Sequence, residues 1–243
     1  MKNYLLAPTL FIAITLYAQK TKTVIINDTL TTTASLIYSD NFNGNLQNWQ
    51  AQHEIAGGSV EIKNSKMEIT ANRGCTVWFT KFLKAPLMIE YDAVMIDKGG
   101  RLDRVSDLNC FWMATDPNDP SGKFINGDEL SGNLGDYNKL KLYYVGLGGR
   151  ENTTTRFRRY PGTGTRPMLP EHDLRDKKHL LTGNTVNRIR IIVYNTIVQY
   201  YRNGQLIFNF NDPAPLSFGY FGFRTTINHM TTDNFKVFKL SEN

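Results

Sequence analysis

Arginine and tyrosine side chains are concentrated in residues 139–160, which read KLKLYYVGLGGRENTTTRFRRY. Tyr143 and Tyr144 lie in an alternating, strand-like run that a glycine cluster follows. The β-favouring run 153–160 that comes next carries Arg156, Arg158 and Arg159. Guanidinium groups bind carboxylates and sulfates through paired hydrogen bonds, and tyrosines supply a flat stacking surface and a hydroxyl. The stretch predicts either the floor of a site for an anionic, ring-shaped ligand or a twisted hairpin with a solvated basic face.

Groups suited to the elimination chemistry of uronate sugars occur in and around this stretch. An arginine would neutralise the uronate carboxylate, so that the C5 proton becomes acidic, while a base removes that proton and an acid protonates the leaving oxygen. Tyr144 and His172 are the predicted base and acid, and we expect them to line one concave surface with Arg156. His172 lies in Pro170-Glu171-His172-Asp173, which is either a loop that presents the imidazole between carboxylates or a surface turn.

Further polar and aromatic residues are predicted to bind the substrate. They are Arg104, Asn109, Trp112, Tyr143, Asn152, Arg156, Arg159, Glu171 and Arg224. Alternation along a regular strand would place Arg156 and Arg159 on opposite faces, and would separate Asn109 from Trp112 in the same way.

No cofactor or metal is predicted. Asp116, Asp119 and Asp128 lack the spacing of an EF-hand, so a calcium ion at this loop is only a weak alternative. Cys75 and Cys110 show no CxxC spacing, and they are expected to form a disulfide or to pack as buried free thiols.

Short β-favouring runs separated by turn residues must position these groups. Runs such as 75–82, 86–96 and 188–194 alternate or are continuously apolar, and no long amphipathic helix is evident. Asn203-Gly204 is the strongest hairpin signal, and Gly204 is expected to adopt a positive φ. The pattern predicts an all-β, two-sheet sandwich of the jelly-roll type, formed by residues 36–243.

The first residues read as an export signal. Lys2 is followed by an apolar run that is short for a membrane span, and Ala18-Gln19 offers a cleavage point, so residues 1–18 are predicted to be a signal peptide. Residues 19–35 are expected to be a linker or a peripheral strand. These features predict a periplasmic or secreted protein. Its mature part is expected to contain no membrane span and to be monomeric.

The charge balance favours an acidic partner outside the cytoplasm. The 243 residues carry a formal net charge of +6, without a nucleic-acid-binding motif, so no nucleic-acid partner is predicted. An exported basic protein meets acidic polysaccharides through long-range attraction.

The opening YSDNFNGNLQNW, the hairpin QYYRNGQLIFNF and the closing GYFGFRTTINHMTTDNFKVFKL resemble the concanavalin A-like lectin/glucanase superfamily. More narrowly, RGCTVWF, MIEYDAVMIDKGG, RVSDLNCFWMATDP and RPMLPEHDL resemble a group of secreted bacterial proteins with a domain of unknown function, found in polysaccharide-degrading bacteria. The resemblance implies a jelly roll and a carbohydrate context.

Retaining glucanases of this superfamily carry their acids as E-x-D-x-x-E on one strand. Here Glu90 and Asp92 are present, but Met95 replaces the third acid, so these two carboxylates are expected to be a solvated outer face or an incomplete acid pair. We therefore expect a secreted protein that binds and cleaves an acidic polysaccharide, by elimination rather than hydrolysis. The alternative is a non-catalytic carbohydrate-binding module of the same fold.

Overall fold

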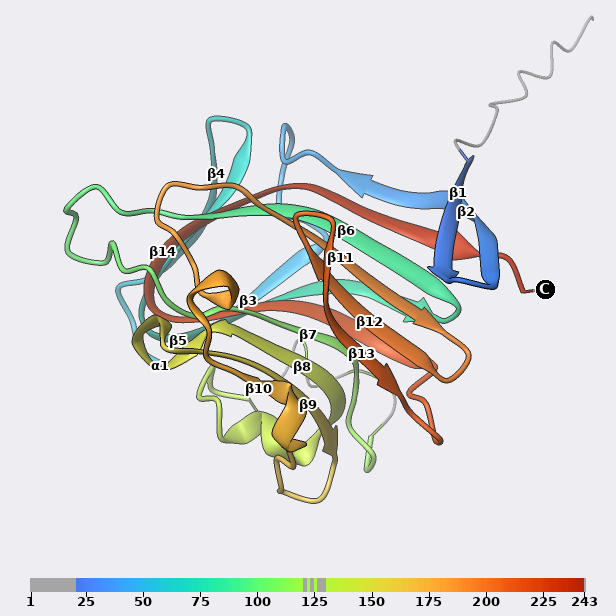
Figure 1. Cartoon of the computed structure of the whole chain (residues 1–243). Helices are drawn as coiled ribbons and strands as arrows, with labels where there is room; N and C mark the ends of the chain where they lie inside the picture. Colours follow the sequence, from blue (N-terminus) through green and yellow to red (C-terminus); the bar gives the residue numbers. More distant parts are fainter. Residues whose placement is uncertain (1–20, 120–121, 123–124, 126–129, 243) are drawn as a thin grey trace, which may run out of the picture.

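The computed structural model describes residues 21–119, 122, 125 and 130–242 (Figure 1). The predicted signal peptide and Asp128 lie outside these residues. Within the described part, no helix is long and apolar enough to cross a membrane.

Fourteen strands make up almost all of the regular structure. They are β1 (Thr21–Asn27), β2 (Leu30–Asp40), β3 (Trp49–His53), β4 (Ser59–Lys63), β5 (Lys66–Lys84), β6 (Leu87–Met95), β7 (Leu108–Thr115), β8 (Lys141–Gly148), β9 (Thr154–Pro161), β10 (Asp173–Leu174), β11 (Asn187–Tyr194), β12 (Ile197–Arg202), β13 (Gln205–Asn211) and β14 (Phe218–Leu240). Short helical turns lie at Asp136–Lys139, Gly149–Asn152 (α1), Pro170–His172 and Lys177–His179.

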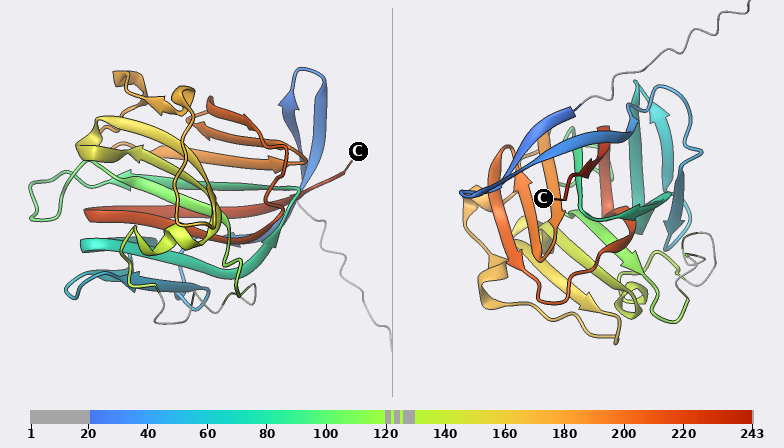
Figure 2. Two further views of the ribbon diagram at one scale, coloured as in Figure 1. Left: turned by 90° about the horizontal axis from the view of Figure 1, so that it is seen from below. Right: turned by 90° about the vertical axis from the view of Figure 1, so that its right-hand side faces the viewer.

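The strands pair antiparallel and form two packed layers (Figure 2). The front sheet has the order β3-β5-β14-β7-β8-β9-β10, and the back sheet runs β4-β5-β14-β6-β11-β12-β13, with β2 beside the end of β14. The long strands β5 and β14 pass through both layers, so hydrogen bonding makes one continuous, curled sheet of 14 strands. The predicted all-β jelly-roll sandwich is confirmed.

The buried apolar side chains form three clusters, one between the two layers and one on the outer face of each layer. The main core lies between the sheets and includes Trp112 and Phe157 from the front sheet and Ile89 and Ile191 from the back sheet. A second cluster lies on the outer face of the front sheet, where Tyr137 of the loop before β8 covers Trp78 and Phe111. A third lies on the outer face of the back sheet beneath β1. The two outer clusters show that both sheets are partly covered by other parts of the chain.

Residues 19–35 were expected to be a linker or a peripheral strand, and the described part of them, from residue 21, lies in the β1–β2 hairpin. Val24 and Ile26 of β1 are buried against Met88 and Ile192 of the back sheet. The hairpin is therefore packed on the sandwich and is not an extended linker.

The β12–β13 hairpin forms at the predicted turn, and the last strand is long and bent. Asn203 and Gly204 have φ values of 52° and 81°, and they connect β12 with β13, as predicted. The last segment, Phe218–Leu240, is the single strand β14. A register shift at Ile227, whose φ is 43°, bends β14 from the front sheet into the back sheet without ending it.

Candidate functional site

The strand register places four predicted residues side by side on the outer face of the front sheet. Arg224 of β14 pairs with Asn109 of β7, Asn109 pairs with Gly146 of β8, and Gly146 pairs with Arg156 of β9. In the next row, Tyr144 lies between Phe111 and Arg158. Because directly paired residues point to the same face of a sheet, both rows face the same side.

A hollow of about 260 Å³ opens over these two rows, and we call it the front pocket. Its floor includes Tyr144, Gly146 and Tyr160. The charged residues around it are Arg150, Arg156, Arg158, Arg166 and Asp107. Four guanidinium groups therefore meet one carboxylate, so the pocket favours an anionic ligand.

The Tyr144 side chain occupies the space beside Gly146 that a side chain at this position would need. A Cβ added at Gly146 would lie 2.6 Å from the Tyr144 hydroxyl, so the glycine leaves the space that this hydroxyl occupies. The ring also packs 5.4 Å from Phe111 and 5.9 Å from Tyr160, between centroids. Burial raises the pKa of Tyr144, while Arg224 and Arg158 act in the opposite direction. The phenol therefore stays protonated at neutral pH, which suits a hydrogen-bond donor or an acid rather than a base.

Arg156 does not present its fork to the pocket. Its Nε lies 2.7 Å from Asp173 Oδ1, and its Nη2 lies 3.1 Å from Oδ2. The hydrogen bond from Arg156 is the main reason that the pKa of Asp173 lies far below its usual range. The expectation that this fork grips a substrate carboxylate is therefore wrong for the geometry seen, because a carboxylate of β10 already occupies it.

Arg158 reaches the pocket from the next row of β9. Its Nη1 donates to the backbone carbonyl of Arg166, which ties the loop after β9 to the strand. Burial lowers the pKa of Arg158, but its reference value is high enough for the group to remain charged. Arg158 and Arg166 thus form one basic wall.

The opposite wall is formed by Asp107, which Arg104 neutralises. Arg104 Nη2 donates to Asp107 Oδ2, and Ser106 Oγ donates to the same oxygen at 2.7 Å. Arg104 therefore fixes a carboxylate at the rim of the pocket rather than lining it directly.

Asn109 and Arg224 are paired across β7 and β14 in the same row as Arg156, but neither lines the front pocket. Asn109 is 4% exposed, and its Oδ1 accepts no hydrogen bond within the described residues. Arg224 donates from Nη1 to the Gly132 carbonyl at 2.6 Å and lies over the Tyr137 ring. Arg224 thus anchors the loop before β8, and Asn109 has an acceptor left for a ligand or a water.

His172 lies on the other side of the front sheet from Tyr144. Its ring packs edge-on against Phe157, Phe208 and Phe210, with centroids 4.9–5.7 Å apart. Phe157 belongs to the core between the sheets, whereas Tyr144 belongs to the outer cluster. The predicted pairing of Tyr144 with His172 is therefore wrong. The interpretation of the segment as a surface turn also fails, because the ring is buried and burial lowers its pKa.

Three further predicted binding residues face the interior of the sandwich. Tyr143 donates to Asp212 Oδ2 at 2.6 Å, and Arg159 Nε donates to the same oxygen at 2.6 Å. Trp112 is fully buried, and its ring lies 5.7 Å from that of Tyr143. Their placement opposite Arg156 and Asn109 follows the alternation predicted for both strands, but it removes all three from the pocket.

The last two predicted residues lie on loops. Asn152 bridges to the next loop, because its Nδ2 donates to Leu181 O at 3.0 Å and its Oδ1 accepts from Leu181 N at 2.8 Å. Glu171 is exposed beside His172, away from Tyr144. Neither lines the front pocket.

Other groups with possible chemistry are engaged elsewhere. Glu90 and Asp92 share the outer face of the back sheet, where Glu90 binds Lys22 and Arg190 and Asp92 accepts from Asn234. Cys75 and Cys110 are buried free thiols, each with a pKa raised to about 12 by burial.

No cluster of three or more metal-binding side chains occurs within the described part of the chain. Asp116 accepts a hydrogen bond from the backbone N–H of Asn118 at 2.8 Å. The calcium alternative at this loop thus gains no support from the described residues.

Sequence reasoning missed several pocket residues for different reasons. Arg158 and Tyr160 follow Arg156 at intervals of two, so strand alternation alone places them on the same face. Arg150 and Arg166 come from loops, and nothing in their spacing shows that they approach β8 and β9. The glycine cluster is visible in the sequence, but the sequence does not show that Tyr144 fills the space left by Gly146.

Solved structures similar to this one share its fold. A protein of unknown function with a galectin-like fold from Bacillus subtilis has a TM-score of 0.66 and 15% identity over 86% of this chain and 97% of its own. The endo-β-1,3-glucanase from Pyrococcus furiosus has a TM-score of 0.55 and 13% identity, covering 91% and 99%. The carbohydrate-binding module CBM66 from Bacillus subtilis has a TM-score of 0.51 and 12% identity, covering 82% and 98%. Identities this low show a common fold and nothing more.

No curated protein sequence matches the chain. A family model does match residues 69–235, which include β6 to β13 and every wall of the front pocket. The chain therefore belongs to the family described as the domain of unknown function DUF6250.

Proposed function

We propose that this protein binds an acidic, uronate-containing oligosaccharide or polysaccharide in the front pocket. The observation that carries the proposal is the set of four arginines around a floor made of Tyr144 and Tyr160. Aromatic rings and hydroxyls suit the faces and edges of a sugar ring, and guanidinium groups suit its carboxylate. Solved neighbours described as a glucanase and a carbohydrate-binding module support a saccharide as the ligand.

Arg158 is the residue that we assign to the ligand carboxylate. Arg156 is held by Asp173 and Arg104 is held by Asp107, whereas the one hydrogen bond of Arg158 uses Nη1. Its Nε and Nη2 make no hydrogen bond within the described residues and supply the donors. Arg150 and Arg166, both exposed, would add attraction from the rim.

Eliminative cleavage at the same pocket is the second candidate function, and the observation in its favour is Tyr144. Its hydroxyl lies among the guanidinium groups and remains protonated, so it would protonate the leaving oxygen. Asp107, the one carboxylate in the lining, would have to accept the C5 proton. As that proton leaves, the electron pair of the C5–H bond forms the C4–C5 double bond, and the C4–O bond breaks.

Calorimetric titration with uronate oligosaccharides from pectin, alginate and hyaluronan tests the binding proposal. We expect at least one of them to bind, and we expect Arg158→Ala to weaken it by about tenfold or more, which is about 1.4 kcal/mol. Arg158→Lys keeps the charge but loses the paired guanidinium donors, so its affinity should lie between those of the parent and Arg158→Ala. Lys178→Ala, an exposed change outside the pocket, is the control. Absence of binding by the whole panel, or equal binding by Arg158→Ala, would contradict the proposal.

Near-ultraviolet absorbance on the same panel separates cleavage from binding. Elimination creates an unsaturated uronate chromophore, whereas hydrolysis or binding does not. We expect Tyr144→Phe to abolish any such signal while changing the dissociation constant by no more than a few-fold. Binding without a signal would rule out eliminative cleavage.

The ligand proposed here is an extracellular polymer, so we propose that the protein acts in the periplasm or outside the cell, as a monomer. The predicted signal peptide at residues 1–18 supports export. Sedimentation of the purified mature protein and fractionation of the cells that make it would test both points.

A further inference from the structure

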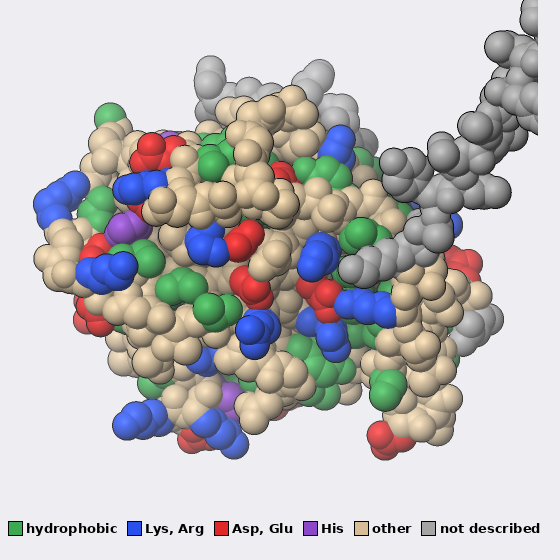
Figure 3. Space-filling model, turned by 90° about the horizontal axis from the view of Figure 1, so that it is seen from above, with side chains coloured by type: hydrophobic (Ala, Val, Ile, Leu, Met, Phe, Trp, Pro, Cys, Tyr) green, Lys and Arg blue, Asp and Glu red, His purple; other side chains and the backbone are tan. Residues whose placement is uncertain are grey.

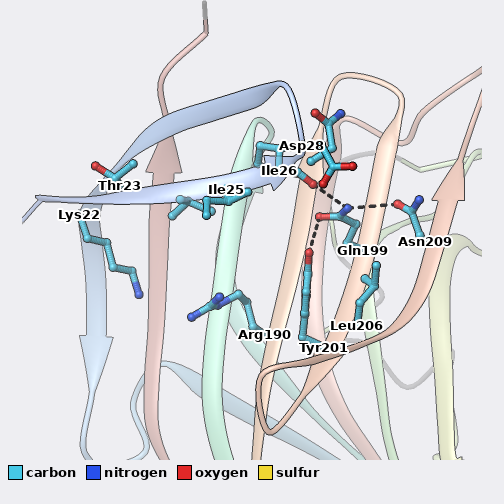
Figure 4. A pocket seen from close by; sticks show the side chains of 12 residues that line it. Lys22, Thr23, Ile25, Ile26, Asp28, Arg190, Gln199, Tyr201, Leu206 and Asn209 are labelled. Carbon is cyan, nitrogen blue, oxygen red and sulfur yellow. Dashed lines mark hydrogen bonds between the residues drawn. The ribbon is translucent and has the colours of Figure 1, made fainter.

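A second hollow lies on the opposite side of the molecule, between β1 and the outer face of the back sheet (Figure 4). Its volume is about 510 Å³, and a neighbouring hollow of about 380 Å³ shares Arg190 and Tyr201 with it. We call the two together the back groove. Volumes of this size are typical of ligand sites, which range from about 300 to 1,000 Å³.

The Tyr201 ring is the aromatic surface of the back groove. It is half-buried, and the Arg190 guanidinium lies 6.0 Å from its centroid. The Tyr201 hydroxyl donates to Gln199 Oε1 at 3.1 Å, and Gln199 Nε2 donates to the Ile26 carbonyl of β1 at 2.9 Å. The ring is thus held in place by a chain of hydrogen bonds that also fixes β1. Binding would therefore cost little conformational entropy for this side chain.

Two side chains that line the same hollow retain unpaired donors. Gln199 Nε2 also donates to Asn209 Oδ1 at 3.1 Å, so the Asn209 amide nitrogen is directed elsewhere, and it makes no hydrogen bond within the described residues. Arg190 uses only Nε, which lies 2.9 Å from Glu90 Oε1. The Arg190 Nη groups and Asn209 Nδ2 are therefore available in the lining of the hollow, where Figure 4 shows Asn209 next to Gln199.

Exposed apolar side chains flank the opening. Ile25 of β1 is 68% exposed and Leu206 of β13 is 47% exposed, and both line the hollow. Large apolar groups exposed beside an ordered polar cluster are typical of interaction sites. A sugar ring has an apolar face and a polar edge, which matches this combination.

The charges of the back groove nearly cancel, unlike those of the front pocket. Its lining contains four basic residues and three acidic ones, and Glu90 alone binds both Lys22, at 2.6 Å, and Arg190. Figure 3, which views this side of the molecule, shows basic and acidic side chains interspersed. We propose that the back groove is a second saccharide-binding site and that its ligand is an uncharged oligosaccharide, stacked on Tyr201 and held by Asn209 and Arg190.

Calorimetric titration with neutral hexasaccharides of β-1,3-glucan, β-1,4-glucan, β-1,4-xylan, β-1,4-mannan and inulin tests this site. We expect at least one to bind, Tyr201→Ala to weaken it by about tenfold or more, and Tyr201→Phe, which keeps the ring, to weaken it by no more than about threefold. Asn209→Ala, an exposed change that leaves the sheet intact, should weaken it by about threefold to tenfold. Phe82→Ala removes a half-exposed aromatic ring from the edge of the front sheet, far from the groove, and should change nothing.

The proposals for the two sites can be contradicted independently of each other. Arg158→Ala should leave neutral oligosaccharides bound as before, and Tyr201→Ala should leave uronate oligosaccharides bound as before. The second site is ruled out if none of the neutral hexasaccharides binds, if binding is the same in Tyr201→Ala and Asn209→Ala as in the parent, or if only Arg158→Ala weakens it.

Discussion

Gly146 determines the shape of the front pocket because its missing side chain is where the Tyr144 hydroxyl lies. A Cβ at this position would approach the hydroxyl oxygen to 2.6 Å and the ring carbon Cζ to 3.0 Å. Both atoms belong to a ring held by Phe111 and Tyr160, so the ring cannot move without disturbing its neighbours.

We therefore expect Gly146→Ala to lower the free energy of unfolding by about 1–3 kcal/mol, the usual cost of overpacking. It should also weaken uronate binding, since the displaced phenol would enter the pocket. Chemical denaturation and calorimetry measure the two effects. Gly44→Ala is the matched control, because a Cβ there meets no atom within 4 Å. Equal stability of the two variants would show that Tyr144 is not confined in this way.

His172 has a structural role with a measurable pH signature. Burial among aromatic rings lowers its pKa, with Glu171 acting in the opposite direction. Below about pH 6.5, the reference pKa, the unfolded chain binds a proton that the folded chain resists. The unfolding free energy therefore falls as the pH drops through this region and is fully retained above it.

We expect His172→Phe to reduce this slope between about pH 5 and about pH 7, where one histidine contributes at most about 1.4 kcal/mol per pH unit. Denaturation curves measured at several pH values give the slope. His53 and His179, whose pKa values are also lowered by burial, should contribute to the remaining slope. An unchanged slope would mean that His172 is not buried in its neutral form.

The sequence predicted the positions of side chains correctly where strand alternation determines which face they occupy. It failed where the packing of loops determines their positions. Alternation separated Arg156 from Arg159 and Asn109 from Trp112, as the structure shows. It could not tell which face is the interior, because both faces of β8 carry aromatic residues that are buried. The position of His172 depends on how a loop packs against β13, and no local pattern encodes that contact.

At the scale of elements, the β12–β13 hairpin is the most local and the best predicted feature. Gly204 has a φ of 81°, which residues with a side chain rarely adopt, although a Cβ there would meet no atom within 4 Å. The position therefore isolates backbone strain from steric contact.

Gly204→Val should lower the free energy of unfolding by about 1–2 kcal/mol, because a β-branched residue is strained at positive φ. Thermal unfolding is the measurement. Gln205→Val, at the neighbouring exposed strand position, is the control and should be nearly neutral. If both variants melted together, the positive φ would not be required.

The long strands show what local signals could not supply. β14 continues through a register shift near residue 227 and joins both sheets. A bulge and a strand end use similar local chemistry, and only the pairing partners distinguish them. The β1–β2 hairpin was also ambiguous, because Val24, Ile25 and Ile26 are all apolar and only Val24 and Ile26 are buried.

At the scale of the whole molecule, charge is divided unevenly between the two proposed sites. The chain carries a net charge of +6, and the front pocket concentrates four arginines against one carboxylate. On the back, Lys22 and Arg190 are both compensated by Glu90. Electrostatic attraction should therefore contribute to binding at the front and hardly at all at the back.

Salt separates the two contributions in one protein. Raising sodium chloride from about 0.05 M to about 0.5 M shortens the screening length from more than 10 Å to about 4 Å, which removes the attraction from the exposed arginines at the rim. We expect the dissociation constant of a uronate oligosaccharide to rise by about tenfold over this range. That of a neutral oligosaccharide should change by less than about twofold, because uncharged stacking and hydrogen bonding do not depend on screening. Arg150→Ala should flatten the salt dependence of the uronate ligand alone, since Arg150 lies at the exposed rim of the front pocket. Equal salt dependence for both ligands would show that they share one site.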